Sequence, residues 1–503
     1  MDSTTWLLVV SAIVLCLSVY YKKKRHSFKD WGIPQPFEVP YLGSVPRNLW
    51  KNYHLSDLMK DMYNFNKEAK YVGMHTFMIP VIIITDIDLV KTVLIKEFDH
   101  FADHRELGDA VGDPLLTKNL IAINGDKWRE LRQLLSPAFT SSKMKLMFEL
   151  MSDCADRFAK SFSEQFLKED DTDMKKAFTK YTNDVIATCA FGIEIDSMKN
   201  PDNEFYRYGR EVTNTDGLAQ LRAIYKMLFM IMFPRFAKFI GMELMREKIS
   251  KFFIGVIDEA IKQRDEKGTT RPDMLQLMMD ARDKNSKLDL VEMTAQAFLF
   301  FVAGFETASS NMSLMAHEIA VNPDVQEKLH AEIDEVSEKS GDKVTYEAIA
   351  NMPYLDAVFQ ETLRLHPQLA FLSRVCSKTF ELPPALPGAK PYVMKVGEEI
   401  MIPVTGIHQD PTFFEEPTKF NPERFLEKKI TTTGDPKSLG FGMGPRMCIG
   451  NRFAILETKV LFFYLLRKHT LQPCSKTCLP LKYHKFKVGP IPKEGFWLRV
   501  RER

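Results

Sequence analysis

The 503-residue sequence predicts a mainly α-helical fold with a small β subdomain. Helical hydrophobic periodicity is sustained over several long stretches, whereas β-like apolar runs are short and few. The long helical stretches are residues 144–166, 249–267, 291–320 and 451–468, and the clearest β-like runs are residues 81–85 and 399–404. No linker-like composition follows residue 50, so we expect one large folded unit over residues 51–503.

The N-terminus predicts a membrane anchor. Residues 3–21 are almost continuously apolar and uncharged, close to the ~20 residues that cross a bilayer as a helix. The basic run Lys22–Arg25 follows, whereas a cleaved signal peptide carries its positive charge before the apolar run. We therefore expect an uncleaved transmembrane helix over residues 1–21, with its basic flank in the cytosol. A basic, proline-rich linker over residues 22–50 then leads to the folded unit.

A second apolar segment, residues 224–240, is too short to span a bilayer. Basic residues flank its apolar centre, a pattern typical of segments that lie in the headgroup region of a membrane. A buried core helix is the alternative interpretation of this segment. We favour the membrane surface.

The helical stretch 291–320 contains the run A-G-F-E-T at residues 303–307. An acid and an alcohol in an apolar helix are costly to bury unless they have partners. Leu299, Ala303 and Thr307 are four residues apart and share one helix face. One interpretation is a helix that opens at Gly304, so that Glu306 and Thr307 form a proton relay. The other is an ordinary core helix in which Thr307 bonds back to its own backbone.

The ten residues 441–450, F-G-M-G-P-R-M-C-I-G, place a cysteine on a glycine-rich loop directly before the helical stretch 451–468. Free N–H groups and the dipole at a helix N-terminus favour a thiolate, the form of cysteine that ligates iron. Gly442 and Gly450 allow the backbone to approach a flat ligand, and Arg446 suits a carboxylate. The loop therefore predicts that Cys448 holds a haem through its sulfur.

Together these patterns resemble the cytochrome P450 family. Residues 441–450 match its haem-binding pattern F-x-x-G-x-R-x-C-x-G, and residues 303–307 match A-G-x-E-T. Residues 361–364 match E-x-x-R, and residues 422–425 match P-E-R-F. The resemblance covers essentially the whole chain. It implies the cytochrome P450 fold with an N-terminal transmembrane helix, and a haem-thiolate catalytic domain over residues 51–503.

The resemblance also implies roles for individual residues. Glu306 and Thr307 would be catalytic, and Cys448 would be the axial ligand of the iron of haem b. Glu361, Arg364 and Arg424 would form a buried structural ion-pair network. The other expected haem-binding residues are Phe441, Gly442, Arg446, Gly450, Trp128, Arg132 and Arg374, and the expected substrate-lining residues are Leu299, Val302, Ala303, Leu369 and Ala370.

The activity implied is that of a monooxygenase, which inserts one atom of dioxygen into a lipophilic small molecule, above all a foreign compound. The chain has no G-x-G-x-x-G pattern after a strand, so electrons from NADPH must arrive through a separate reductase. We expect NADPH–cytochrome P450 reductase as this partner, docked near Arg129, Lys437 and Arg446, with cytochrome b5 as a further candidate. The overall pattern is similar to the animal microsomal branch, and residues 98–101 to insect members. This implies the endoplasmic reticulum membrane, with the catalytic domain in the cytosol.

Three alternatives stay open at this point: a dedicated hydroxylase of an endogenous lipid or hormone, a haem-thiolate isomerase or dehydratase that needs no reductase, and a haem-binding protein without turnover. The intact Glu306–Thr307 pair favours the monooxygenase over the last two. A net charge of +2 without a basic stripe in the folded unit argues against nucleic-acid binding. Seven cysteines, an odd number in a chain expected in the cytosol, predict free thiols.

Overall fold

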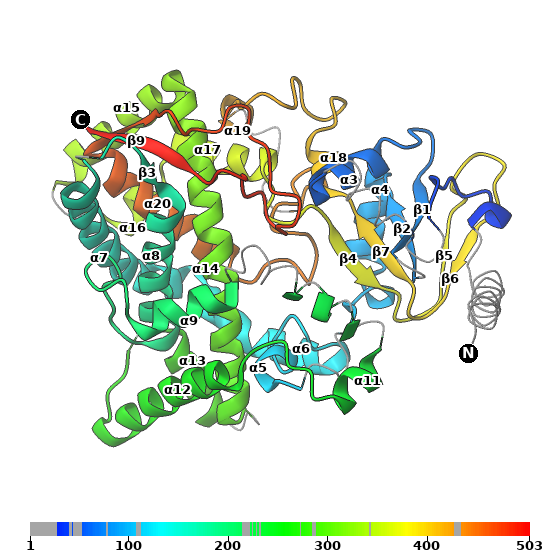
Figure 1. Cartoon of the computed structure of the whole chain (residues 1–503), viewed down its shortest axis with the longest axis horizontal. Coiled ribbons are helices and arrows are strands. Elements are labelled where there is room, and N and C mark those ends of the chain that lie inside the picture. The colour runs from blue at the N-terminus through cyan, green and yellow to red at the C-terminus, as the bar shows by residue number, and fades with distance from the viewer. Residues whose placement is uncertain are drawn as a thin grey trace, which may run out of the picture. The chain divides into compact units, whose positions relative to one another are not determined.

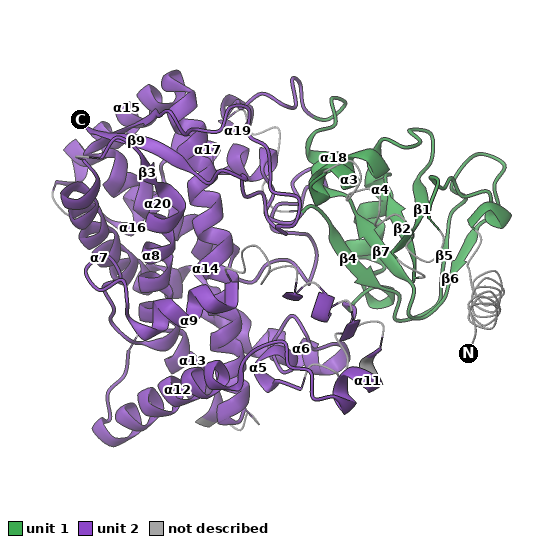
Figure 2. Cartoon of the chain, in the orientation of Figure 1, with its two compact units in different colours: residues 1–103, 370–413 green, residues 104–369, 414–503 purple. Residues whose placement is uncertain are grey.

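The computed structural model describes residues 28–503, except for residues 40–42, 44–52, 77–78, 107–111, 168, 214–221, 224, 228, 231–232, 272, 284–287, 342–343 and 427–433. The predicted transmembrane helix 1–21 and the basic run Lys22–Arg25 lie outside the described residues. The chain divides into two compact units (Figure 2). Unit 1 comprises residues 1–103 and 370–413, and unit 2 comprises residues 104–369 and 414–503.

Unit 1 is built on a four-stranded sheet of order β1-β2-β7-β4. Strand β2 pairs with β1 in antiparallel register and with β7 in parallel register, which joins the two chain segments of the unit. Apolar residues of α3, β1, β2 and β7 form its core. Its elements are η1 (Phe28–Trp31), α3 (Leu55–Tyr63), β1 (Tyr71–Thr76), β2 (Ile79–Ile84), α4 (Ile87–Lys91), η2 (Thr92–Lys96), η3 (Phe98–His100), β4 (Leu372–Val375), β5 (Phe380–Leu382), β6 (Tyr392–Met394), β7 (Glu399–Ile402) and α18 (Val404–His408).

The first described residues of unit 1 pack against strand β1. Phe28 is fully buried, and its ring lies where a Cβ on Gly73 would come within 2.4 Å. Glu38 accepts a hydrogen bond from the His75 backbone N–H (2.6 Å), and a second Glu38 oxygen lies 2.8 Å from His75 Nδ1. Part of the predicted linker 22–50 is thus folded onto the sheet.

Unit 2 is predominantly helical and contains a small antiparallel sheet of order β3-β9-β8 (Figure 1). Its elements are α5 (Pro114–Thr117), α6 (Gly125–Leu135), η4 (Ser136–Phe139), α7 (Ser141–Phe166), β3 (Thr172–Asp173), α8 (Met174–Ile186), η5 (Ala187–Phe191), α9 (Glu204–Thr213), α11 (Pro234–Phe239), α12 (Glu247–Lys267), α13 (Met274–Asp283), α14 (Leu290–Val321), α15 (Pro323–Ser340), α16 (Tyr346–Ala350), α17 (Pro353–Leu365), α19 (Glu423–Leu426), α20 (Asn451–Leu466), β8 (His469–Pro473) and β9 (Trp497–Glu502).

Helix α14 is the central helix of unit 2 (Figure 1). A capping box starts it, since the Asp289 side chain accepts from the Glu292 N–H and the Glu292 side chain accepts from the Asp289 N–H. The helix contacts α8, α5, α12, α17 and α20 within the unit. Among the described residues it is the helix long and apolar enough to cross a membrane. Its contacts with these neighbours are those of a core helix.

The long helical stretches predicted from periodicity are confirmed as α7, α12, α14 and α20, and the two β-like runs fall in β2 and β7. The chain forms two compact units, and the expectation of one large catalytic domain over residues 51–503 stays a prediction. Strands far apart in the sequence pair to form unit 1, so no flexible linker marks its boundaries.

Candidate functional site

The loop that carries Cys448 is closed by short backbone hydrogen bonds and ends at helix α20. The Cys448 N–H donates to the Phe441 carbonyl (2.9 Å), which folds the loop back before the helix begins. Gly442 and Gly444 have φ values of 77° and 75°, a left-handed backbone that other residues adopt only with strain. Gly450 is the N-cap residue of α20. The Cys448 sulfur therefore lies at the N-terminal end of a helix, as predicted.

The electrostatic environment of Cys448 differs from the prediction in one respect. The side chain is solvent-accessible, yet protein atoms surround it closely enough that burial raises the pKa of the thiol. A backbone hydrogen bond from Gly450 and the charge of Arg132 act in the opposite direction and lower the pKa. The helix start thus favours the thiolate without outweighing desolvation. A metal ion at the sulfur is the further influence that would stabilise the thiolate.

Helix α17 packs against this loop. The Phe359 ring of α17 stacks on Phe441 at 6.2 Å between centroids, with 15° between the ring planes. A Cβ on Gly440 would lie 2.5 Å from Leu363 Cγ, so the helix and the loop approach each other at a position where only a hydrogen fits. The position of the loop therefore depends on α17.

The E-x-x-R pair of α17 forms a buried network with the P-E-R-F segment. The fully buried Glu361 accepts from Arg364 Nε (2.7 Å) and Nη2 (2.8 Å). The same carboxylate accepts from Arg424 Nε (3.1 Å) and from the Asn421 N–H (2.9 Å). Arg364 also donates to the Pro417 carbonyl (2.8 Å). The network joins α17 to the segment 417–424.

Helix α6 brings Trp128 and Arg132 close to the cysteine loop. The guanidinium of Arg446 lies 4.0 Å from the centre of the buried Trp128 ring and donates to the Ile123 carbonyl (3.1 Å). Arg132 lies one turn farther along α6, where burial lowers its pKa and Cys448 raises it. Arg132 is thus close enough to Cys448 to influence its charge, and Arg446 of the cysteine loop packs on Trp128 of α6, all within unit 2.

Arg374 belongs to unit 1, on strand β4. It is 3% exposed, its Nη1 donates to the Ser373 carbonyl (2.7 Å), and burial lowers its pKa to about 10. Its Nε has no hydrogen-bond partner among the described residues. A buried N–H of this kind fits an anionic group that the protein itself does not supply. That Arg374 binds the same ligand as Arg446 stays a prediction.

These residues fit a haem. An accessible sulfur on a loop of left-handed glycines can approach a flat ring, and Arg and Trp donors suit its two carboxylates.

Helix α14 runs unbroken through residues 303–307, in contrast to the predicted opening at Gly304. The Thr307 hydroxyl donates to the Ala303 carbonyl, the bond expected of an ordinary core helix. Ala303 and Thr307 are nevertheless exposed on a helix that is otherwise largely buried, and Leu299 and Val302 are half-buried. The predicted face is therefore accessible, although the helix does not open.

Glu306 has a partner that the sequence did not indicate. Lys175 Nζ lies 3.1 Å from Glu306 Oε1 and donates to Ser309 Oγ (2.6 Å) and Ser310 Oγ (2.8 Å). Burial lowers the pKa of Lys175, whereas the charge of Glu306 raises it. Lys175 is on α8, which packs along α14. No local pattern could reveal the pair, because its members are far apart in the sequence.

The remaining predicted lining residues lie in different settings. Leu369 belongs to unit 2 and is 50% exposed. Ala370 is buried in the core of unit 1, against which Leu386 and Phe371 also pack, and its lining role stays a prediction. The two are adjacent in sequence, and the boundary between the units passes between them.

Comparison with known proteins agrees with this geometry. The family model described as Cytochrome P450 matches residues 34–499. The chain is 38% identical to Cytochrome P450 9e2 of Blattella germanica, over 99% of this chain and 98% of that protein. It is 35% identical to Probable cytochrome P450 9f2 (95% of each) and to Probable cytochrome P450 6a13 (99% and 98%), both of Drosophila melanogaster. The chain therefore belongs to the cytochrome P450 family and is a monooxygenase of that family.

Proposed function

We propose that this chain is a membrane-anchored haem-thiolate monooxygenase of lipophilic foreign compounds, served by a separate NADPH-dependent reductase. One observation carries the proposal: an accessible cysteine thiol at the start of α20, in the same unit as the half-buried Glu306 and the exposed Thr307 of α14. The similarity to insect cytochromes P450 over nearly the whole chain supports it.

In this proposal Cys448 holds haem b through its sulfur, and Arg446, Trp128, Arg132 and Arg374 serve its propionates. The backbone at Gly442 and Gly450 leaves room for the ring, and Phe441 is fixed against α17. When bound, haem supplies the iron that activates dioxygen, and a thiolate ligand favours cleavage of the O–O bond.

Glu306 and Thr307 would deliver protons on the accessible face of α14. The Thr307 hydroxyl donates its proton to the Ala303 carbonyl, so its oxygen lone pairs are left to accept a proton. Glu306 would take up a proton from solvent at its carboxylate and return it to Thr307 Oγ1 as the Thr307 hydroxyl gives its own proton to the reacting oxygen. Lys175 acts as a positioning residue, because its ammonium holds the Glu306 carboxylate at 3.1 Å.

The substrate would lie against the apolar part of the same face. Leu299, Val302 and Ala303 present only hydrocarbon there, which favours lipophilic compounds and provides no ionic contact for selecting one of them. The small Ala303 side chain leaves space beside Thr307. Broad handling of foreign compounds fits such a surface better than a dedicated polar substrate does.

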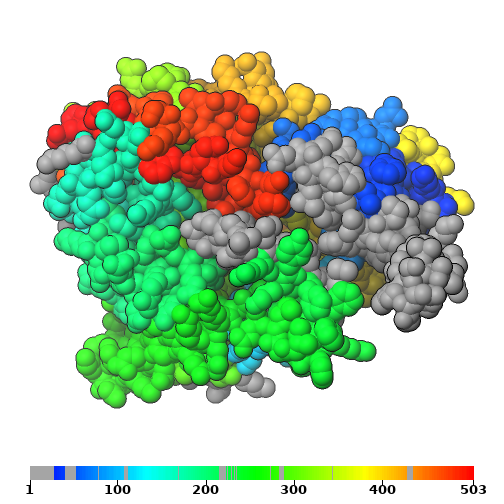
Figure 3. Space-filling view, viewed as in Figure 1, coloured from blue at the N-terminus to red at the C-terminus, as the bar shows by residue number. Residues whose placement is uncertain are grey.

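The membrane association proposed here is the endoplasmic reticulum, through the anchor 1–21 and a second contact near α11. Phe233, Phe236 and Phe239 are 51%, 55% and 84% exposed, with Lys238 among them also exposed. This green-coloured part of the chain lies on the surface in Figure 3. Apolar rings beside a lysine suit the headgroup boundary. In a chain without residues 1–21, F236D/F239D should abolish the remaining membrane association, and unchanged association would refute the second contact.

NADPH–cytochrome P450 reductase, with cytochrome b5 as a further candidate, would dock on the basic residues near the cysteine loop. The Arg446 guanidinium is engaged with the Ile123 carbonyl and Trp128. Arg129, whose side chain is 44% exposed, and Lys437 are further docking candidates. Lys437→Glu should raise the KM for the reductase and leave the haem spectrum unchanged. An unchanged KM would remove Lys437 from the docking surface.

Turnover of 7-ethoxycoumarin by the haem-loaded full chain, with reductase and NADPH, tests the function. We expect dealkylated product only when both are present. Thr307→Ala should lower product formed per NADPH by about tenfold or more. Thr294→Ala is the matched control, because Thr294 also donates to a carbonyl one turn back on α14 (2.7 Å) but lies outside residues 303–307. A conversion that proceeds equally without reductase and NADPH would instead favour an isomerase or dehydratase.

A further inference from the structure

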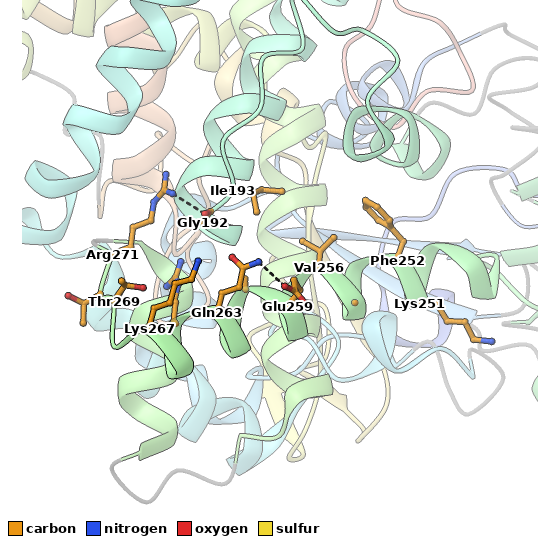
Figure 4. Close-up of a pocket in the computed structure, with 14 residues that line it drawn as sticks. Gly192, Ile193, Lys251, Phe252, Val256, Glu259, Gln263, Lys267, Thr269 and Arg271 are labelled. Carbon is orange, nitrogen blue, oxygen red and sulfur yellow. Dashed lines mark hydrogen bonds between the residues drawn. The ribbon is translucent and has the colours of Figure 1, made fainter.

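Unit 2 contains a groove of about 850 Å3 that shares no residue with the candidate haem site. One wall is a face of α12, and the other is formed by Gly192 and Ile193, which follow η5. The α12 residues Phe252, Val256, Glu259, Gln263 and Lys267 recur every three or four positions and point into the groove from the same side (Figure 4). Phe252 and Lys267 are fifteen positions apart on the helix, which corresponds to a length of about 22 Å.

One end of the groove is mainly apolar. Phe252, Val256 and Ile193 line it and are half-buried. The Phe252 ring lies 4.7 Å from the Tyr208 ring and 5.3 Å from the Phe253 ring, so an aromatic cluster fixes it from behind. This end can receive hydrocarbon without rearrangement.

The other end is basic. Lys267 and Arg271 line it, together with the exposed Thr269 and Thr270 (Figure 4). Arg271 donates to the Gly192 carbonyl (3.0 Å), which holds its guanidinium at the groove. Hydroxyl, ammonium and guanidinium donors together suit a carboxylate.

The acidic groups near the groove already have partners. The fully buried Asp273 accepts from Arg264 Nη1 (2.9 Å) and Nη2 (2.5 Å), and Arg271 Nε lies farther from it, at 3.7 Å. Glu259, midway along the groove, accepts from Gln263 Nε2 (2.7 Å). Lys267 and Arg271 therefore keep donors for an anion at the basic end.

We propose that this groove binds a free long-chain fatty-acid carboxylate, at a site separate from the haem site. The acyl chain lies along α12 toward Phe252, and the carboxylate meets Lys267 and Arg271. Three properties lead to this choice of ligand: the length of the groove, its apolar end, and the gathering of Lys267 and Arg271 at the opposite end. Lys251, beside the apolar end, pairs with Glu247 (2.9 Å). The volume is within the range of small-molecule sites, about 300–1,000 Å3.

The test uses the haem-loaded full chain in phosphatidylcholine nanodiscs with a photoactivatable palmitate as the probe. Mass spectrometry of the cross-linked peptides should locate the label within residues 252–271. Palmitate should compete for labelling, whereas methyl palmitate, which lacks the charge, should not. Equal competition by the ester would overturn the carboxylate assignment, and equal labelling by an anionic diacyl phospholipid probe would overturn the choice of a free acid.

Variants of α12 distinguish labelling in the groove from nonspecific adsorption of the probe to the protein surface. A Cβ on Gly255 meets nothing within 4 Å, so Gly255→Trp should fill the groove and block labelling, whereas Gly255→Ala should not. K267E/R271E should weaken competition by palmitate about tenfold. Lys262→Glu is the charge-matched control, because Lys262 is on α12 but pairs with Asp258 (2.7 Å) outside the groove. Absence of label at residues 252–271, or label that Gly255→Trp leaves unchanged in folded protein, would refute the site.

Discussion

The buried carboxylate of Glu361 offers a quantitative test of how unit 2 supports the cysteine loop. The perturbation is Glu361→Gln, which keeps the shape of the side chain and removes its charge. Four N–H donors now converge on the carboxylate at 2.7–3.1 Å, three of them from the guanidiniums of Arg364 and Arg424. The side chains of Arg364 and Arg424 are 2% and 11% exposed, so water can replace few of the hydrogen bonds that the carboxylate accepts from them.

The expected cost follows from this geometry. Removing one member of a buried ion pair leaves an uncompensated charge and costs roughly 3–5 kcal/mol. Glu423→Gln is the matched control. Glu423 precedes Arg424 in the sequence and pairs with Lys328 at the surface, where the two side chains are 45% and 54% exposed. Such a surface pair contributes about 0–1 kcal/mol.

The assay is urea unfolding followed by tryptophan fluorescence, together with haem content per folded chain. Glu361→Gln should lower the free energy of unfolding by several kcal/mol and reduce haem content, whereas Glu423→Gln should do neither. A partial return of stability in E361Q/R364M would show that the unpaired guanidinium causes the loss. Equal unfolding free energies for Glu361→Gln and Glu423→Gln would refute the reasoning.

Three further changes have defined outcomes. Lys175→Met removes the ammonium that holds Glu306, a contact worth about 1 kcal/mol at this partial exposure, so product formed per NADPH should fall roughly fivefold. Lys175→Arg keeps a positive charge and should retain the product yield. Equal product per NADPH in the two variants would contradict the positioning role of Lys175. Burial lowers the pKa of His317 to about 4, below the ~6.5 of an unfolded histidine, so its contribution to stability is present above pH 6.5 and lost as the pH falls toward 4. The free energy of unfolding, measured in urea, should therefore fall between pH 7.5 and pH 4.5 by up to about 3 kcal/mol less in His317→Gln than in the wild type. The same fall in both proteins would contradict this assignment. Gly442→Ala, at a φ of 77°, should cost about 1–2 kcal/mol and weaken haem retention, in contrast to Gly255→Ala; unchanged retention would show that the loop tolerates a side chain.

The parts of this structure that the sequence predicts are those that depend on local periodicity. The bounds of α7, α12, α14 and α20 follow from apolar spacing, and the loop before α20 follows from its glycines and cysteine. One local feature differs from the proton-relay interpretation of residues 303–307. The Thr307 hydroxyl donates to the Ala303 carbonyl, and α14 does not open at Gly304.

Contacts between distant segments could not be predicted in the same way. Lys175 meets Glu306 only because α8 packs along α14, and three lysines in and near the first turns of α8 look equivalent in sequence. The pairing of β2 with β7 likewise joins two distant segments into unit 1, and no change in composition marks the boundaries of that unit. The groove on α12 could not be predicted either, because five of its fourteen lining residues come from outside this helix.

The identity of the iron ligand is the central claim, and one spectrum tests it most directly. The carbon monoxide difference spectrum of the dithionite-reduced chain should show the strongly red-shifted Soret band of cysteine-thiolate haem. The band should be lost in Cys448→Ala and kept in Cys376→Ala, which removes a buried cysteine of unit 1. A band at the position of histidine-ligated haem, or a red-shifted band that survives Cys448→Ala, would contradict the account.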